Sequence, residues 1–180
     1  NSDVVKEVKV INNDRVTKET ILVFADIEIG KNYDSNDLNK ILRDLYNTDF
    51  FSDISLSFND GILVVDVKEN KIIQNIEFNG IKKKELIEIL KKQILSKDKN
   101  PFVQIYVKKD IERIQNILKN SGYYFSTVTD QIIENNNDTV NIIFNVEIGE
   151  KAYIKSIEFI GDKHFKDRIL RNIIVSEETK

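Results

Sequence analysis

The chain has 180 residues, of which 41% are hydrophobic, 32% are charged and one is proline. This composition excludes a disordered tail and leaves room for one or two globular domains. The net charge is −3 and the basic residues are spread along the chain, which excludes the basic footprint of a nucleic-acid-binding protein. The absence of cysteine excludes disulfides, and no apolar stretch approaches the roughly 20 residues of a membrane-spanning helix.

Three segments share one pattern, in which apolar and polar residues alternate and an Asn or Gly closes the run. They are residues 8–12, 76–80 and 157–161, spaced roughly 70 to 80 residues apart. The alternation predicts half-buried strands, and the closing residues are those that tolerate a positive φ. We therefore predict an internal repeat, with each copy opening on a strand and continuing into an amphipathic helix.

Two further amphipathic helices are predicted at residues 37–47 and 110–120, where apolar residues recur three and four positions apart. Each begins near an aspartate, a favoured residue for a helix N-cap or first turn. Each runs into an aromatic pair, Phe50-Phe51 or Tyr123-Tyr124, and then into a strand.

Both complete copies end in a predicted hairpin. In the first, Asp60-Gly61 favours a tight turn between alternating residues 53–58 and the nearly continuous apolar run 62–67, which is typical of a central strand. In the second, the polar loop 135–138 separates strands near 128–133 and 140–148.

Each full copy thus reads strand–helix–helix–strand–strand, which predicts an α+β fold. We expect domains at 1–70 and 71–150, joined by short linkers near 70–73 and 149–153. Residues 151–180 hold only a predicted first strand near 153–160 and a helix near 166–175 of a third copy. Because such a piece is too small to bury a core, we expect a longer natural chain.

The order of elements resembles the POTRA domain family, and most of all the POTRA domains of BamA-type outer-membrane assembly factors. The resemblance rests on the glycine–aromatic lead-in at 30–34, on the helix-to-strand passages at 45–54 and 118–124, on the hairpin closes at 65–70 and 144–150, and on the first strands at 76–80 and 157–161. Two positions depart from the family pattern: Asp49 stands where glycine is common, and residues 97–102 replace the usual glycine lead-in.

The resemblance implies tandem POTRA domains, each with a three-stranded mixed sheet backed by two helices. It implies a location at the periplasmic face of the outer membrane, attached to a C-terminal membrane barrel. The implied partners are unfolded outer-membrane proteins, periplasmic chaperones and accessory assembly lipoproteins. It implies no enzymatic activity and no cofactor.

In this fold the strand after the second helix lies at a sheet edge, where a client chain can add by main-chain hydrogen bonds, a mode called β-augmentation. The candidate edges are 52–58 and 126–133. The candidate binding residues are Asp53, Ile54, Ser55, Leu56 and Ser57, with Thr127, Val128, Thr129, Asp130 and Gln131. The alternative is an ordinary solvated edge, kept polar against aggregation.

Aromatic residues at the helix-to-strand junctions suggest a groove lined by Tyr46, Phe51 and Tyr124, with Tyr123 as a further candidate. The alternative is that these rings pack in the core, and we expect Phe50 and Tyr123 to be the buried pair.

No catalytic, metal or cofactor site is predicted. His164 is the only histidine and has no partner ligands, residues 135–138 lack a calcium-loop pattern, and no phosphate-binding glycine motif occurs. The lysine run 82–84 reads as a solvated helix face, with contact to an anionic membrane as the alternative.

Two other functions stay open. The domains could belong to a translocation and assembly module or to a two-partner secretion transporter. Alternatively, the chain could be an unrelated α+β module for ligands or RNA, although residues 62–67 carry no aromatic side chain of the kind that RNA-binding sheets use.

Overall fold

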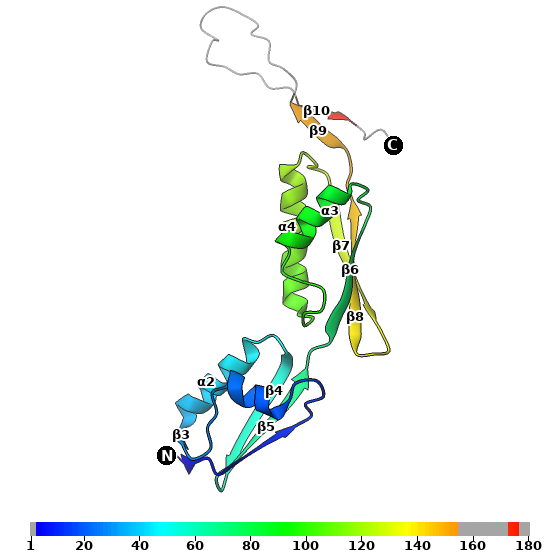
Figure 1. Ribbon diagram of the computed structural model, residues 1–180. Helices are drawn as coiled ribbons and strands as arrows, with labels where there is room; N and C mark the ends of the chain where they lie inside the picture. The colour runs from blue at the N-terminus through cyan, green and yellow to red at the C-terminus, as the bar shows by residue number, and fades with distance from the viewer. Residues whose placement is uncertain (1–2, 155–172, 177–180) are drawn as a thin grey trace, which may run out of the picture. The chain divides into compact units, whose positions relative to one another are not determined.

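The computed structural model describes residues 3–154 and 173–176. The chain divides into two compact units. The first is built from residues 1–73 with 99–103 and 137–139, and the second from residues 74–98, 104–136 and 140–180. Figure 1 shows the order of helices and strands within each unit.

The first unit holds a three-stranded mixed sheet with two helices on one of its faces (Figure 1). Its elements are β2 (Glu7–Ile11), α1 (Lys18–Phe24), α2 (Ser35–Tyr46), β4 (Phe51–Asn59) and β5 (Ile62–Glu69), together with a short antiparallel pair of β1 (Asp3–Val4) and β3 (Asn32–Tyr33). Strand β5 is central, as predicted, with β2 parallel on one side and β4 antiparallel on the other. Asp60 and Gly61 both have positive φ, which confirms the predicted tight turn between β4 and β5.

The second sheet repeats this topology. Its elements are β6 (Ile72–Asn79), α3 (Lys84–Gln93), α4 (Gln104–Asn120), β7 (Thr127–Glu134) and β8 (Thr139–Glu147), in the sheet order β6–β8–β7. Both helices lie on one face of this sheet (Figure 1). Leu90, Ile114 and Ile142 are fully buried between the two layers, and Phe78 stacks on Phe144 with ring centroids 5.4 Å apart. The predicted α+β class, with β-α-α-β-β repeats, is confirmed.

The predictions for residues after 150 are corrected in part. Strand β9 (Lys151–Ile154) pairs antiparallel with β10 (Ile173–Ser176). Residues 173–175, which we predicted to end a helix, are therefore a strand, in keeping with the β-branched sequence Ile-Ile-Val. The rest of the predicted helix, and residues 155–160 of the predicted strand, lie outside the described residues.

The second helix of each unit begins differently. In α2, Asp34 is the N-cap and Asp37 the third helical residue, and each side chain accepts a backbone N–H from the other residue. The Asp37 N–H holds the pKa of the Asp34 carboxyl below its ordinary value. In α4, however, the helix already begins at Gln104, so the prediction that Asp110 starts it is wrong.

Asp110 instead lies fully buried in the middle of α4 and holds the chain that follows α3. Its carboxylate accepts hydrogen bonds from the N–H groups of Leu95, at 2.6 Å, and Ser96, at 3.1 Å. A buried carboxylate is tolerated here because it accepts from two backbone N–H groups that lie just beyond the end of α3 and would otherwise need another acceptor.

In the first unit a carboxylate at the end of the central strand has a comparable role. Glu69 accepts backbone N–H groups from Asp14, Arg15 and Val16, the loop that leads into α1. This explains why the hairpin close ends on a glutamate. The carboxylate supplies acceptors for a loop that has no strand to pair with.

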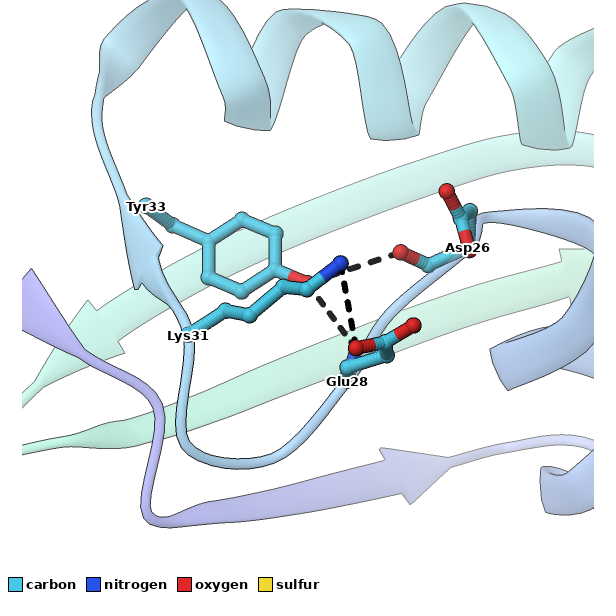
Figure 2. A network of polar contacts seen from close by, with 4 residues as sticks. All are labelled: Asp26, Glu28, Lys31 and Tyr33. Atoms are coloured by element: carbon cyan, nitrogen blue, oxygen red, sulfur yellow. Dashed lines mark hydrogen bonds and ion pairs between the residues drawn. The ribbon is translucent and has the colours of Figure 1, made fainter.

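The glycine–aromatic lead-in closes the loop ahead of α2. The Tyr33 hydroxyl accepts the Glu28 N–H at 2.9 Å and donates to the Asp26 carbonyl at 3.5 Å (Figure 2). Lys31 forms an ion pair with Glu28 at 3.0 Å, and this bond raises the pKa of Lys31 above its ordinary value. The buried aromatic ring thus fastens the loop to the start of the helix.

The two departures from the family pattern are accommodated without a change of backbone. Asp49 has a φ of 64° and Gly122 a φ of 98°, so both end their helices in the left-handed conformation. Likewise Lys99 has a φ of 67° in the loop ahead of α4, where Gly30 has 96° in the corresponding loop of the first unit. Aspartate tolerates this conformation better than most residues, and lysine holds it at a modest cost.

We expect Asp110→Ala to destabilise the second unit by about 3 kcal/mol, because two buried N–H groups lose their acceptor. Urea denaturation of the whole chain, followed by far-UV circular dichroism, measures the change. Glu112→Ala, at an exposed position of the same helix, is the control and should leave stability within about 0.5 kcal/mol. Equal effects of the two substitutions would contradict the role given to Asp110.

Candidate functional site

Strands β4 and β7 each occupy one edge of their three-stranded sheet, as predicted. The side chains of Asp53, Ser55 and Ser57 are exposed along β4, and those of Thr127, Thr129 and Gln131 are exposed along β7. Of the other predicted residues, Ile54 and Val128 belong to the core, Leu56 is half-buried and Asp130 is exposed. The candidate residues therefore divide into solvent-facing side chains and core-facing side chains on one strand.

One hydrogen bond reveals which backbone groups of β4 point away from the sheet. The Ile54 N–H donates to the Tyr46 hydroxyl at 3.0 Å rather than to β5. Ile54 and its partner Val67 therefore form a pair without ladder hydrogen bonds. Because such pairs alternate along an antiparallel ladder, the N–H and C=O groups of Leu56 and Phe58 also point to the open edge.

The close approach of Gly80 to the Val146 carbonyl shows which backbone groups of β7 point away from the sheet. A Cβ atom on Gly80 would lie 1.8 Å from the Val146 carbonyl oxygen, so this carbonyl points toward the end of β6. The N–H of Val146 points the same way, and its partner across the ladder is Val128. By alternation, the open edge of β7 carries the N–H and C=O groups of Val128, Asp130 and Ile132.

The outward backbone groups thus belong to the residues whose side chains share a face with the core. The residues with small polar side chains on the opposite face use their backbone to bond the central strand. A strand added at either edge would meet the backbone of Leu56 or Asp130 and, alongside it, the rim of the helix layer.

The residues predicted to line an aromatic groove differ in their burial. Tyr46 and Tyr124 are 41% and 53% exposed, so both rings lie at the surface. Phe51 is only 3% exposed and belongs to the core, whereas Phe50 is half-buried and stacks on Phe24. The expected burial of Tyr123 is confirmed. In the first unit, however, the buried aromatic residue is Phe51 and not Phe50. The assignment of Phe51 to the groove is therefore wrong.

Phe51 is buried in place of Phe50 because the register of β4 is irregular. The pairing with β5 shifts between Phe51 and Asp53, so that one extra residue is accommodated at the start of the strand. The shift turns the Phe51 ring inward and leaves the Phe50 ring to cover α1. The sequence does not show this irregularity.

The sequence did not predict that Tyr46, at the end of α2, accepts a hydrogen bond from the backbone of the edge strand β4. The Tyr46 hydroxyl accepts the Ile54 N–H and lies 3.4 Å from an Asp53 carboxylate oxygen. A tyrosine in the last helical turn, eight residues before an edge residue, is the only sequence signal for this contact.

Among the residues that the structure describes, no three metal-ligating side chains gather in one place. His164 lies outside those residues. Within the same part of the chain, no helix has both the length and the apolar character that crossing a membrane requires.

A family model described as "POTRA: Surface antigen variable number repeat" matches residues 71–149. The chain is 27% identical over 177 residues to the outer membrane protein assembly factor BamA of Neorickettsia risticii, and 24% identical over 179 residues to that of Nitratidesulfovibrio vulgaris. These alignments cover 98% and 97% of the chain. The N-terminal domain of Omp85 from Thermosynechococcus elongatus has a similar fold, with a TM-score of 0.56 and 15% identity over 83% of this chain and 64% of that chain.

Residues 71–149 belong to the POTRA domain family, and the fold of the chain is that of tandem POTRA domains. The sequence relatives are BamA proteins and the similar structure is that of an Omp85 protein, so the chain is similar to proteins of the BamA and Omp85 type. The chain spans 24% and 22% of the two BamA proteins it matches, so it corresponds to about a quarter of their length.

The assignment of open edges predicts a pattern of amide exchange. The amides of Leu56 and Phe58 should exchange at least about tenfold faster than those of Ser55 and Ser57, which bond the central strand. Likewise Val128, Asp130 and Ile132 should exchange faster than Thr129 and Gln131. Hydrogen–deuterium exchange followed by NMR measures these rates, and the reverse alternation would show that the ladder phase is wrong.

Proposed function

We propose that this chain is the periplasmic, client-binding part of a BamA-type outer-membrane assembly factor. In this proposal it binds unfolded outer-membrane proteins as extended strands and promotes their folding and insertion into the outer membrane. It acts as a scaffold and not as an enzyme. The names of the curated relatives favour this function over a translocation and assembly module or a two-partner secretion transporter.

We also propose the domain limits. The first POTRA domain spans residues 1–70, the second spans 71–150, and residues 151–180 begin a third. The match of the family model to 71–149 supports the second of these domains, and the repeated sheet order supports the first.

The observation that carries the proposal is the open edge of β7. Val128, Asp130 and Ile132 offer a row of three N–H and three C=O groups toward solvent. The side chains on the flanking positions Thr127, Thr129 and Gln131 are polar and do not project into the plane of the sheet. Because recognition uses the backbone, clients with unrelated sequences can pair with the same edge.

We propose the same mode for β4, through Asp53, Ile54, Ser55, Leu56 and Ser57. The exposed rings of Tyr46 and Tyr124 provide apolar contact for client side chains next to the two edges. Periplasmic chaperones, accessory assembly lipoproteins and a C-terminal membrane barrel are the further partners that this function requires.

An NMR titration tests the proposal with the whole chain and a peptide of alternating apolar and polar residues, the pattern of a membrane-barrel strand. We expect the amide signals of β7 to shift most. A second peptide, N-methylated at every other residue, should lose binding when the methyl groups replace the N–H groups that face the domain. The alternate set of methyl groups should leave binding intact. Equal losses from the two sets would exclude strand addition.

The Asp130→Pro variant removes one outward N–H, which an edge strand tolerates because the group has no ladder partner. We expect its peptide affinity to fall at least about fivefold, the value of one hydrogen bond of about 1 kcal/mol. Asp130→Ala removes the same carboxylate but keeps the N–H group, so its affinity should stay near that of the native chain. Loss of binding in both variants would assign recognition to the side chain rather than to the backbone.

A further inference from the structure

The edge of β4 is partly occupied by a side chain of its own unit. Tyr46 ends α2, and its hydroxyl accepts the outward N–H of Ile54 at 3.0 Å. The same hydroxyl donates a hydrogen bond to the Asp53 carboxylate at 3.4 Å. The tyrosine therefore occupies the first outward donor of this edge, in the position that a client carbonyl would otherwise take.

The corresponding position in the second unit does not carry such a group. The sequences Leu45-Tyr46-Asn47 and Leu118-Lys119-Asn120 match, and both leucines are fully buried at the ends of their helices. The tyrosine is thus replaced by Lys119, whose side chain has no acceptor for a backbone N–H. In the described part of the chain, apart from the ladder with β8, no hydrogen bond from another segment reaches the backbone of residues 127–133.

The two edges consequently offer different lengths of open backbone. On β7, the outward groups of Val128, Asp130 and Ile132 are all available. On β4, a client that pairs along the full strand must first displace the Tyr46 hydroxyl from Ile54, which leaves Leu56 and Phe58 as the readily available positions. Each exchanged hydrogen bond of this kind changes an affinity by roughly fivefold to tenfold.

We propose that Tyr46 is a latch on the β4 edge, so that an extended client strand docks on β7 in preference to β4. The inference rests on the proposed function, because it assigns strand addition to one of the two candidate edges. Removal of the hydroxyl opens the β4 edge and makes the two edges more alike.

The latch itself is tested without any client. In Tyr46→Phe, the ring stays and the acceptor for Ile54 is lost, so we expect the Ile54 amide to exchange at least about fivefold faster. Tyr33→Phe is the matched control, because it removes a hydroxyl that accepts a backbone N–H in the same unit. It should accelerate exchange at Glu28 and not at Ile54. Unchanged exchange at Ile54 in Tyr46→Phe would overturn the proposal.

The preference is tested by titrating the native chain and Tyr46→Phe with the alternating peptide while NMR follows the amides of β4 and β7. We expect native binding at β7 at least fivefold tighter than at β4, and a gain at β4 alone in the variant. Equal native binding at both edges would overturn the latch while leaving the proposed function in place. Binding at neither edge in either protein would overturn both.

Discussion

A three-stranded sheet satisfies the backbone of its central strand on both sides and leaves each outer strand with one open row of N–H and C=O groups. In this chain β5 and β8 take the central places, and β4 and β7 are edges. Burying such an edge without partners would cost several kcal/mol of desolvation. Leaving it in water keeps the fold stable and offers a ready template for another strand. The proposed activity follows from this requirement of the backbone rather than from any reactive side chain.

The connections between the layers face the same requirement, and carboxylates meet it at different places in the two units. Glu69 accepts the N–H groups of the loop before α1, while Asp110 accepts those of the chain after α3. The bonds of both carboxylates fix the segments that connect the helices to the sheet. The helices cover one face of each sheet, and the solvent-facing side chains of the edge strands lie on the other. Glu69 and Asp110 therefore stabilise the strands that would bind a client, although neither carboxylate would contact the client itself.

The asymmetry of the edges shows how a repeat can diverge while its fold is kept. The helix-to-strand passage preserves a left-handed residue in both units, Asp49 in one and Gly122 in the other. A single difference next to the buried leucine, Tyr46 against Lys119, decides whether the edge carries an internal hydrogen bond. Tandem domains of identical topology are therefore unequal docking sites in our proposal.

The resemblance to the POTRA family implied the edge positions, whereas the sequence by itself determined the repeat, the order of strands and helices, and the central strand of the first copy. These features depend on local periodicity and on turn residues such as Asp60-Gly61, whose preferences act over a few neighbouring positions. Only the tertiary structure decided that Phe51 rather than Phe50 is buried, that Asp110 lies within a helix as a buried acceptor, and that Tyr46 reaches the Ile54 N–H. Each of these depends on where the chain places two segments in space, through a strand irregularity, a longer helix or a side chain crossing to an edge. No local pattern carries that information, because the partners are brought together by packing.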